Sequence, residues 1–290
     1  MSIAALPSRI GRPSLRRLAS RQYRSLLVGA LLAATAALLA VIGPWIAPYS
    51  PTNGIPGTQL QPPSASHWFG TDSVGLDVFS RVLAAPRTDL TIALLATLLA
   101  AAVGTPIGAA AGYYRALWPE ILMRISDLIQ SFPVFILAMV TVVVAGHNIQ
   151  GIVFVVALVN APFYVRLMRA EVLSLRERTF IQAAEAIGLP GWMVIAKHLV
   201  PNAIGPILSQ ASVTVGFAML LTAGLSFVGA GVRVPTPEWG SMIAIGAPNI
   251  VTGEWWPSTF PGLALSVTVL GFALLGDSLQ ILADPSRRRP

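Results

Sequence analysis

Residues 128–165, LIQSFPVFILAMVTVVVAGHNIQGIVFVVALVNAPFYV, form a long, mainly apolar stretch without Asp, Glu, Lys or Arg. A bilayer core about 30 Å thick takes roughly 20 apolar helical residues to cross, so this stretch exceeds one crossing. Near its middle, Gly146, His147 and Asn148 form a polar cluster of turn-favouring residues. The stretch therefore predicts two membrane-spanning helices joined by a short external turn that contains His147.

Four more uncharged runs lie on either side of this stretch, at residues 25–45, 90–114, 199–232 and 255–276. Each is long enough to cross a bilayer as one helix. We predict an all-α integral membrane protein with six transmembrane helices, at about 25–46, 89–114, 120–145, 149–168, 203–230 and 258–282. The expected organisation is an N-terminal cytoplasmic segment (1–24), a first helix with an external loop (25–87) and a transmembrane domain (88–290).

The composition agrees with a membrane protein. Of the 290 residues, 54% are hydrophobic and 11% are charged, whereas ordinary globular chains carry about 25% charged residues. A water-soluble enzyme is therefore excluded. Because the chain has no Cys and only three His, disulfide frameworks, thiolate nucleophiles and cysteine zinc sites are excluded as well.

The positions of the basic residues give the expected orientation, because Lys and Arg concentrate in cytoplasmic loops. With the N-terminus inside, three basic residues fall outside, namely Arg81, Arg87 and Arg233. The other sixteen are then cytoplasmic: Arg9, Arg12, Arg16, Arg17, Arg21, Arg24, Arg115, Arg124, Arg166, Arg169, Arg176, Arg178, Lys197, Arg287, Arg288 and Arg289. We expect a prokaryotic plasma membrane protein with both termini in the cytoplasm. The net charge of +7 then reflects orientation and lipid contact, and nucleic acid is not an expected partner.

Residues 1–47 have an alternative interpretation as a secretory signal, since Arg-rich residues precede an apolar stretch. That stretch exceeds the roughly 7–15 residues of a signal core, and no small-x-small cleavage site follows it closely. We therefore interpret it as the first membrane anchor.

The longest cytoplasmic connection, residues 169–202, has a pattern of its own. Ser174 and Glu177 have the spacing of a capping box, while Gly188 and Pro190 are a typical helix stop. We predict a short amphipathic helix at about 174–188, followed by a helical piece at 192–199 that ends at Pro201-Asn202.

On this helix, small alanines would form the contact side, and four polar residues would face water: Arg176, Arg178, Gln182 and Glu185. Docking into the groove of a partner protein is preferred, because alanines bury too little area to hold a helix on a lipid surface. Binding to the lipid surface is the alternative.

No energy source is visible in the chain. The single lysine, Lys197, does not belong to a Walker A motif, so ATP would have to be bound and hydrolysed by a partner. We find no ionisable residue in the middle of a predicted span, as ion coupling would require. The metal-binding helix and nucleophile elbow of hydrolases are also missing. We therefore expect neither catalysis nor a cofactor in this chain.

Small residues recur along one face of the fifth predicted helix: Ser209, Ser212, Gly216, Ala223 and Ser226. Tight helix packing and the lining of a translocation path are both compatible with such a face. In the second predicted helix, Gly104, Thr105, Pro106, Gly108 and Gly112 are interpreted as packing and kink positions.

The cytoplasmic connection resembles the EAA loop of prokaryotic ABC-importer permeases. The family pattern is Glu-Ala-Ala, three residues, Gly, nine residues and Ile-x-Leu-Pro. The matching positions here are Gln182, Ala183, Ala184, Gly188 and Pro201, with Gln182 in place of Glu, His198 in place of Ile and Val200 in place of Leu. The sequence His198-Leu199-Val200-Pro201-Asn202 resembles the dipeptide, oligopeptide and nickel branch of that family.

Other motifs are similar to those of the C-type subunit of the same branch. They are residues 67–72 with 75–81, where Leu76 replaces a usual Arg; Arg124-Ile125-Ser126-Asp127 with Phe132-Pro133; residues 224–229 with Trp239-Gly240; and residues 276–279 with Asp284-Pro285.

The resemblance implies a type I ABC-importer permease fold with a cytoplasmic coupling helix. It also implies a second permease subunit, two cytosolic ATPases that hold ATP and Mg²⁺, and an external substrate-binding protein. The coupling residues would be Gln182, Ala183, Ala184, Glu185, Gly188, His198, Pro201 and Asn202. Among them, Ala183, Ala184 and Gly188 would allow close approach to the ATPase.

The expected function is import of di- or oligopeptides through a path shared with the second permease. A nickel, haem or other small-solute importer is one alternative, and an ion-coupled or passive carrier without ATPases is another. A pure scaffold is disfavoured, since it needs no six crossings. The loop at 231–257, with Trp239, Trp255 and Trp256, is expected either to meet the binding protein or to anchor at the membrane interface.

Overall fold

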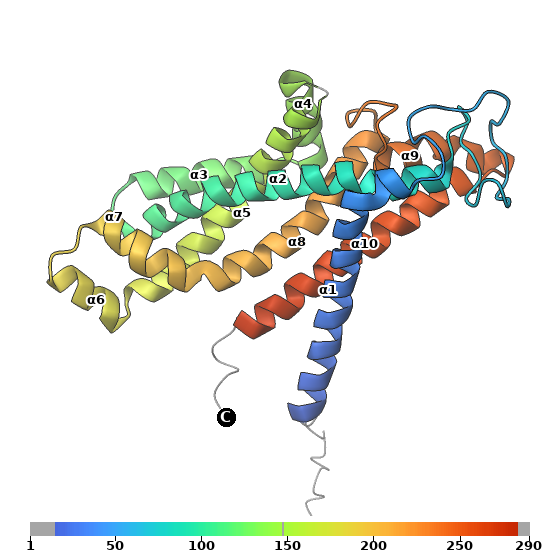
Figure 1. Cartoon of the computed structure of the whole chain (residues 1–290). Helices are drawn as coiled ribbons and strands as arrows, with labels where there is room; N and C mark the ends of the chain where they lie inside the picture. Colours follow the sequence, from blue (N-terminus) through green and yellow to red (C-terminus); the bar gives the residue numbers. More distant parts are fainter. Residues whose placement is uncertain (1–14, 147, 284–290) are drawn as a thin grey trace, which may run out of the picture.

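The computed structural model describes residues 15–146 and 148–283, which form helices and connecting loops (Figure 1). The helices are α1 (Leu15–Ile46), α2 (Val78–Tyr113), α3 (Trp118–Ser131), α4 (Val134–Ala145), α5 (Ile149–Arg176), α6 (Thr179–Ala186), α7 (Gly191–Val194), α8 (Val200–Phe227), α9 (Trp239–Gly246) and α10 (Trp256–Ala283). A π-helical turn, η1 (Ile195–Leu199), joins α7 to α8, and a 3-10 helix, η2 (Ala247–Thr252), follows α9. His147, Arg9, Arg12, Asp284, Pro285 and Arg287 to Arg289 lie outside the described residues.

Five helical segments of the described chain are long and apolar enough to cross a membrane: Tyr23–Ile46, Val78–Tyr113, Ile149–Arg176, Gly191–Phe227 and Trp256–Ile281. The sixth predicted span, at 120–145, is not one straight helix. It consists of α3 and α4, which meet at an angle of 98°. The bend lies at Phe132 and Pro133, where the proline ring disfavours the helical conformation of the preceding residue. Six spans result if the bent pair counts as one.

The second span begins earlier than predicted, at Val78 rather than at residue 89. The carboxylate of Asp77 caps the helix by accepting a hydrogen bond from the Ser80 N–H at 2.8 Å. Arg81 and Asp89 lie within the first turns of α2, and both are buried. The sequence-based prediction began the span at residue 89, after Arg81 and Arg87, whereas the fold supplies hydrogen-bond partners for Arg81 and Asp89.

Glycines bring α2 and α5 together along their length. Gly104, Gly108 and Gly112 recur every four residues on one face of α2. A Cβ atom on Gly104 would lie 2.7 Å from the Ala161 carbonyl oxygen, and one on Gly108 would lie 2.4 Å from that of Val165. Backbone contact between membrane helices requires small residues of this kind. The predicted packing role of these glycines is confirmed.

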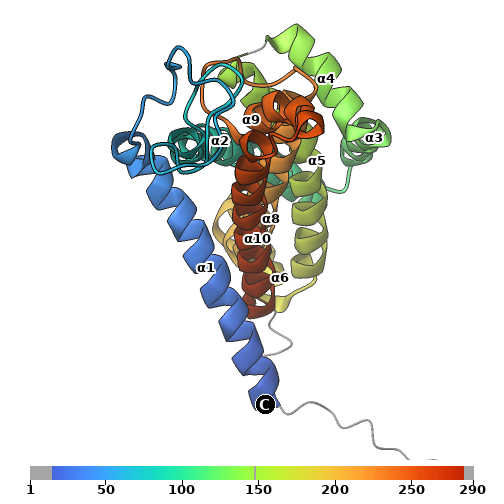
Figure 2. The same cartoon turned by 90° about the vertical axis from the view of Figure 1, so that its right-hand side faces the viewer.

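Helices α1, α8 and α10 form the other side of the bundle (Figures 1 and 2). A Cβ atom on Gly29 of α1 would lie 2.7 Å from the Leu275 nitrogen, and one on Gly276 of α10 would lie 2.5 Å from the Val213 side chain. Figures 1 and 2 show the start of α1 and the end of α10 on the same side of the molecule, away from α9. That arrangement is the one an even number of crossings produces.

Candidate coupling site

The short helix α6 lies in the connection between α5 and α8, but it begins later than predicted. Ser174 belongs to α5, which ends at Arg176, and α6 begins at Thr179 with Arg178 as a cap that makes no side-chain hydrogen bond. The predicted capping box of Ser174 and Glu177 is therefore wrong. Helix α5 continues past Ser174 because Val172 is buried against Gly112 of α2.

The two faces of α6 differ in what they contact. Ile181 and Ala184 are buried in the protein core. Phe180, Ala183 and Ile187 are exposed, and their spacing of three and four residues places them on one helical stripe. Ile187 is 78% exposed, an unusual position for a side chain of this size outside a membrane or an interface. The outer surface of α6 is therefore exposed and partly apolar.

The predicted coupling residues on α6 divide between these faces. Gln182, Ala183, Glu185 and Gly188 are exposed, whereas Ala184 is buried. The expectation that a partner approaches closely at Ala184 is thus wrong, because the methyl group of Ala184 already packs inside this chain. Arg176 was expected to face water, yet its side chain is only 18% exposed.

Helix α6 ends as predicted. Gly188 has φ +78°, a left-handed conformation that glycine adopts without strain. Its N–H donates to the Glu185 carbonyl at 2.9 Å, and the N–H of Leu189 donates to the Ala184 carbonyl at 3.2 Å. Pro190 then caps α7. This turn aims the chain back toward the bundle.

The predicted helix break at Pro201-Asn202 is wrong. Helix α7, the π-helical turn η1 and α8 follow one another without interruption, and together they form one span from Gly191 to Phe227. Pro201 directly follows the π-helical turn η1, which changes the backbone hydrogen-bond pattern just before the residue that lacks an N–H. The side chain of Asn202 donates to the His198 carbonyl at 2.6 Å. His198, Pro201 and Asn202 therefore lie within the continuous helix that runs from α7 to α8.

The end of α2 fixes this segment in place. Arg176 Nη1 donates to the carbonyl oxygens of Gly112 and Tyr113 at 3.3 and 3.5 Å, so it compensates the negative end of α2. On α7, a Cβ atom on Gly191 would lie 2.7 Å from the Tyr113 ring. Helix α6 is thus attached to a rigid frame on both sides.

The small-residue face of α8 packs against α10 of the same chain. Ser212 Oγ donates to the Phe272 carbonyl at 3.0 Å, and Gly216 lies beside Val269 and Phe272. Ser209 is buried, and its hydroxyl donates to the Gly205 carbonyl at 3.2 Å. The packing role of this face is observed. Its role in a translocation path stays a prediction.

Near α9, Ser226 and two of the three tryptophans predicted to be external serve packing, whereas Trp255 is 47% exposed. Ser226 Oγ accepts a hydrogen bond from the Val232 N–H at 3.3 Å. Trp239 and Trp256 are buried, and their ring N–H groups donate to the carbonyls of Val82 and Thr71 at 3.3 and 3.1 Å. The sequence had suggested that these rings meet a binding protein or the membrane interface. Because both are buried, neither ring is available for that contact.

The motif at residues 67–81 forms a hydrogen-bonded loop before α2. The ring nitrogen Nδ1 of His67 lies 2.8 Å from Asp77 Oδ1. Asp72 accepts hydrogen bonds from the N–H groups of Val74 and Leu76 at 3.0 and 2.9 Å. Burial nevertheless raises the pKa of Asp72. Leu76, which stands where the family motif has Arg, is buried in this loop.

Sequence reasoning missed a buried polar cluster behind this loop. Glu238 caps α9 by accepting hydrogen bonds from the N–H groups of Gly240 and Ser241 at 2.8 and 2.7 Å. Asp89 of α2 accepts one from the Trp239 N–H at 3.2 Å. Burial raises the pKa of Glu238, although the backbone hydrogen bonds act in the opposite direction.

Arg81 Nη1 donates to the carbonyls of Pro51 and Pro235 at 2.9 and 3.1 Å. No local pattern indicates contacts between residues so distant in sequence.

Comparison with known proteins identifies the family. The model of the "binding-protein-dependent transport system inner membrane component" family matches residues 104–289. The chain belongs to this family. It is 39% identical over 249 residues to a probable D,D-dipeptide transport system permease protein of Escherichia coli, covering 86% of this chain and 83% of that one.

Other relatives agree with this assignment. The dipeptide transport system permease protein of Alkalihalophilus pseudofirmus is 37% identical over 262 residues, covering 90% of this chain and 86% of its own. The glutathione transport system permease protein of an Escherichia coli strain is 36% identical over 266 residues, with coverages of 91% and 88%. The fold and the resemblance to permeases of this branch are therefore confirmed.

Proposed function

We propose that this chain is the membrane-spanning permease subunit of an ATP-driven importer of peptides. In this proposal it forms a translocation path with a second, homologous permease. An external binding protein delivers the substrate, and two cytosolic ATPase subunits or domains bind ATP with Mg²⁺. The chain itself is non-catalytic. The proposal rests on membership of the binding-protein-dependent family and on relatives that transport a D,D-dipeptide, dipeptides and glutathione.

The observation that carries the coupling role is the outer surface of α6. Exposed apolar side chains on a short helix require a partner or a lipid surface, and the exposed Gln182 and Glu185 beside them favour a protein groove. We assign Phe180, Ala183 and Ile187 as the central contacts with the ATPase, with Gln182 and Glu185 at the rim.

Force would pass from α6 into the membrane along two routes. Only two residues separate the end of α5 at Arg176 from the start of α6, and α7 leads through η1 into α8 without a break. A displacement of α6 by the ATPases would therefore tilt α5 and α8 together. Since Ser212 and Gly216 join α8 to α10, the tilt would extend to α10 as well.

The proposed location is the inner membrane of a prokaryote, with both termini in the cytoplasm. It is supported by the distribution of basic residues and by the side of the molecule on which the described ends of α1 and α10 lie (Figure 1). In this orientation α6 is cytoplasmic and α9 is external.

The deciding experiment is purification of the tagged chain from its native membrane in mild detergent, with the bound proteins identified by mass spectrometry. We expect a second permease and ATPases that contain Walker A motifs, in stoichiometric amounts. Proteoliposomes of that assembly, supplied with the binding protein, should take up peptide only with ATP. Recovery of this chain alone from a transport-active preparation would instead support an ion-driven or passive carrier.

A further inference from the structure

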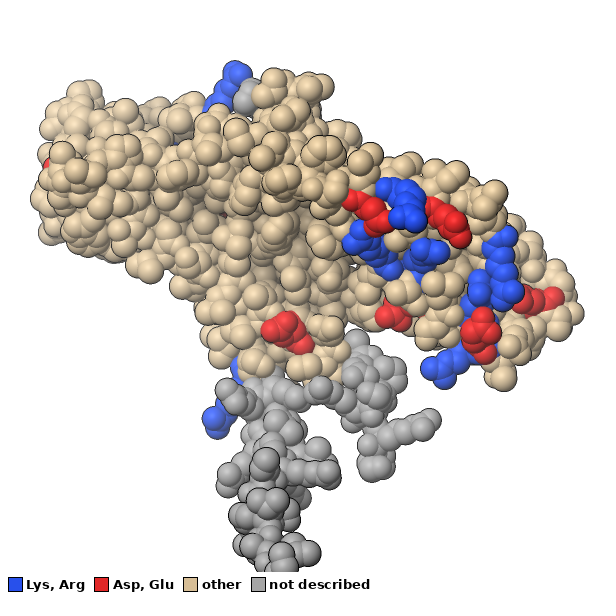
Figure 3. All heavy atoms as spheres, turned by 180° about the vertical axis from the view of Figure 1, so that it is seen from behind, with Lys and Arg blue, Asp and Glu red and all other residues tan. Residues whose placement is uncertain are grey.

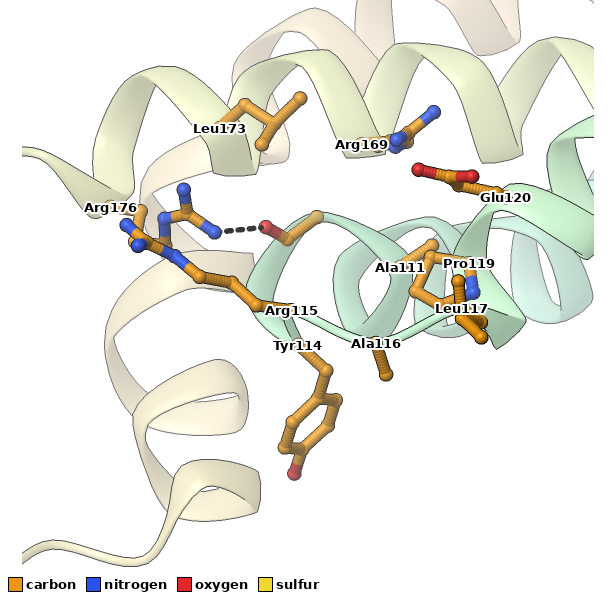
Figure 4. Close-up of a pocket in the computed structure, with 11 residues that line it drawn as sticks. Ala111, Tyr114, Arg115, Ala116, Leu117, Pro119, Glu120, Arg169, Leu173 and Arg176 are labelled. Atoms are coloured by element: carbon orange, nitrogen blue, oxygen red, sulfur yellow. Dashed lines mark hydrogen bonds between the residues drawn. The ribbon is translucent and has the colours of Figure 1, made fainter.

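A pocket of about 500 Å³ opens at the turn between α2 and α3 (Figure 4). Three of its lining residues are arginines: Arg115 in the turn, and Arg169 and Arg176 on α5. Arg169 and Arg176 are seven residues apart, so they lie on the same face of α5. Figure 4 shows Arg115 and Arg176 meeting at one end of the pocket and Arg169 at the other.

These arginines have few anionic partners. Glu120 is the one carboxylate among the residues that line the pocket. Glu177, outside it, lies 4.0 Å from Arg115 and 3.5 Å from Arg176, and its side chain is largely exposed. The Nε atoms of Arg169 and Arg176 are buried and have no hydrogen-bond partner among the described residues. Partly buried guanidinium groups with unpaired N–H groups favour binding of an anion.

The rim of the pocket is apolar. Leu117 is 79% exposed, and Leu173 and Trp118 also present part of their side chains to the surroundings. Trp118 does not line the pocket itself, but its ring lies 6.3 Å from that of Tyr114, which does. Tryptophan and tyrosine at the ends of membrane helices are typical of the headgroup region.

The pocket lies at the end of the bundle that the positive-inside rule assigns to the cytoplasm. Figure 3 shows charged side chains gathered over this end of the molecule, while most of the remaining visible surface is uncharged. At this depth a phosphate group and acyl chains are both available from the bilayer. Basic pockets between membrane helices on the cytoplasmic side are suited to anionic lipid headgroups.

We propose that this pocket is a binding site for an anionic glycerophospholipid. The phosphodiester is bound by Arg115 and Arg176 at one end of the pocket, and Arg169 at the other end adds positive charge near the headgroup. The acyl chains lie along Leu117 and Leu173 and over the neighbouring Trp118. Free phosphate shares the headgroup chemistry, but it would leave the apolar rim without a role. Because Arg176 also binds the end of α2, an occupied pocket would stabilise the α2–α5 frame from which α6 extends.

The test uses the full-length protein with the subunits that co-purify with it, titrated with phosphatidylglycerol or phosphatidylcholine and followed by native mass spectrometry. The variants are Arg115→Gln, Arg169→Gln and the double variant. Arg124→Gln is the matched control, since Arg124 is exposed on α3 and does not line the pocket. The Arg115 side chain is 79% exposed, so its replacement leaves the fold intact even if Arg169→Gln does not.

We expect the wild-type protein and Arg124→Gln to prefer phosphatidylglycerol over phosphatidylcholine. Each pocket substitution should weaken phosphatidylglycerol binding roughly fivefold, and the double variant roughly 25-fold. Inorganic phosphate in excess should not displace the lipid. The proposal is overturned if Arg115→Gln binds phosphatidylglycerol as tightly as Arg124→Gln, or if the two lipids bind equally. Displacement by inorganic phosphate would overturn the lipid assignment in favour of free phosphate. None of these outcomes depends on transport or on the identity of the ATPases.

Discussion

Replacing Ile187 by alanine removes the largest exposed apolar contact that we assign to the coupling surface. Ile187 is 78% exposed in this chain, so the substitution takes almost nothing from the fold. Complete burial of an isoleucine side chain stabilises an interface by about 1.5–3 kcal/mol, and alanine retains only its methyl group. If the partner buries the exposed part, the loss is about 1.5–2 kcal/mol. Binding of the ATPases should therefore weaken roughly 10- to 30-fold.

The assay measures binding of the co-purifying ATPases to the permease reconstituted in nanodiscs, with surface plasmon resonance as the readout. Ile250→Ala is the matched control, because Ile250 is 50% exposed in η2, beyond α9 and far from α6. We expect Ile250→Ala to bind the ATPases like the wild-type protein. Equal affinities of Ile187→Ala and Ile250→Ala would refute the assignment of this surface of α6.

Three further predictions concern residues at the end of α6 and at the start of α9. Gly188→Ala should destabilise the end of α6 by about 1–2 kcal/mol, because alanine is strained at φ +78°. Gly188→Asn should destabilise it less, because asparagine adopts this conformation more readily. Hydrogen exchange of the α6 amides measures the difference. Gly240→Ala should lower the melting temperature in detergent, since its Cβ would lie 2.4 Å from the Ala223 Cα, while Gly262→Ala, whose nearest neighbour is 3.9 Å away, should not. Burial raises the pKa of Glu238 above its ordinary 4.5, so the folded chain holds this proton more tightly than the unfolded chain. The contribution of Glu238 to stability is then complete below pH 4.5 and is lost as the pH rises through the folded-state pKa. Glu238→Gln should therefore reduce the pH dependence of the melting temperature. An unchanged pH profile in this variant would contradict the prediction.

Membrane spans were predictable because a bilayer imposes a simple requirement on composition and length. The end of the first apolar stretch predicted the end of α1 at Ile46, and the polar turn at residues 146–148 predicted the start of α5 at Ile149. The start of α2 was not predictable in this way. Arg81 and Asp89 are tolerated there only because Pro51, Pro235 and Trp239 supply hydrogen bonds, and these partners come from distant parts of the chain.

The coupling segment shows a similar division. Gly188 and Pro190 predicted the end of α6 because positive φ and a missing N–H are local properties. The start was mispredicted, since Ser174 and Glu177 fit a local rule that the tertiary contacts of Val172 and Arg176 override. The continuity of η1 with α8 likewise depends on packing rather than on Pro201 alone.

In the proposed mechanism, the orientation of α6 decides which of its residues can transmit force. Because Ile181 and Ala184 are buried against the chain's own core, α6 cannot rotate about its axis without exposing them. A push on Ala183 or Ile187 is therefore carried by the frame rather than absorbed by the helix. Arg176, which joins α5 to the end of α2, opposes independent movement of α5. The geometry thus favours a rigid-body tilt of α2, α5 and α8 over a local rearrangement of the coupling segment.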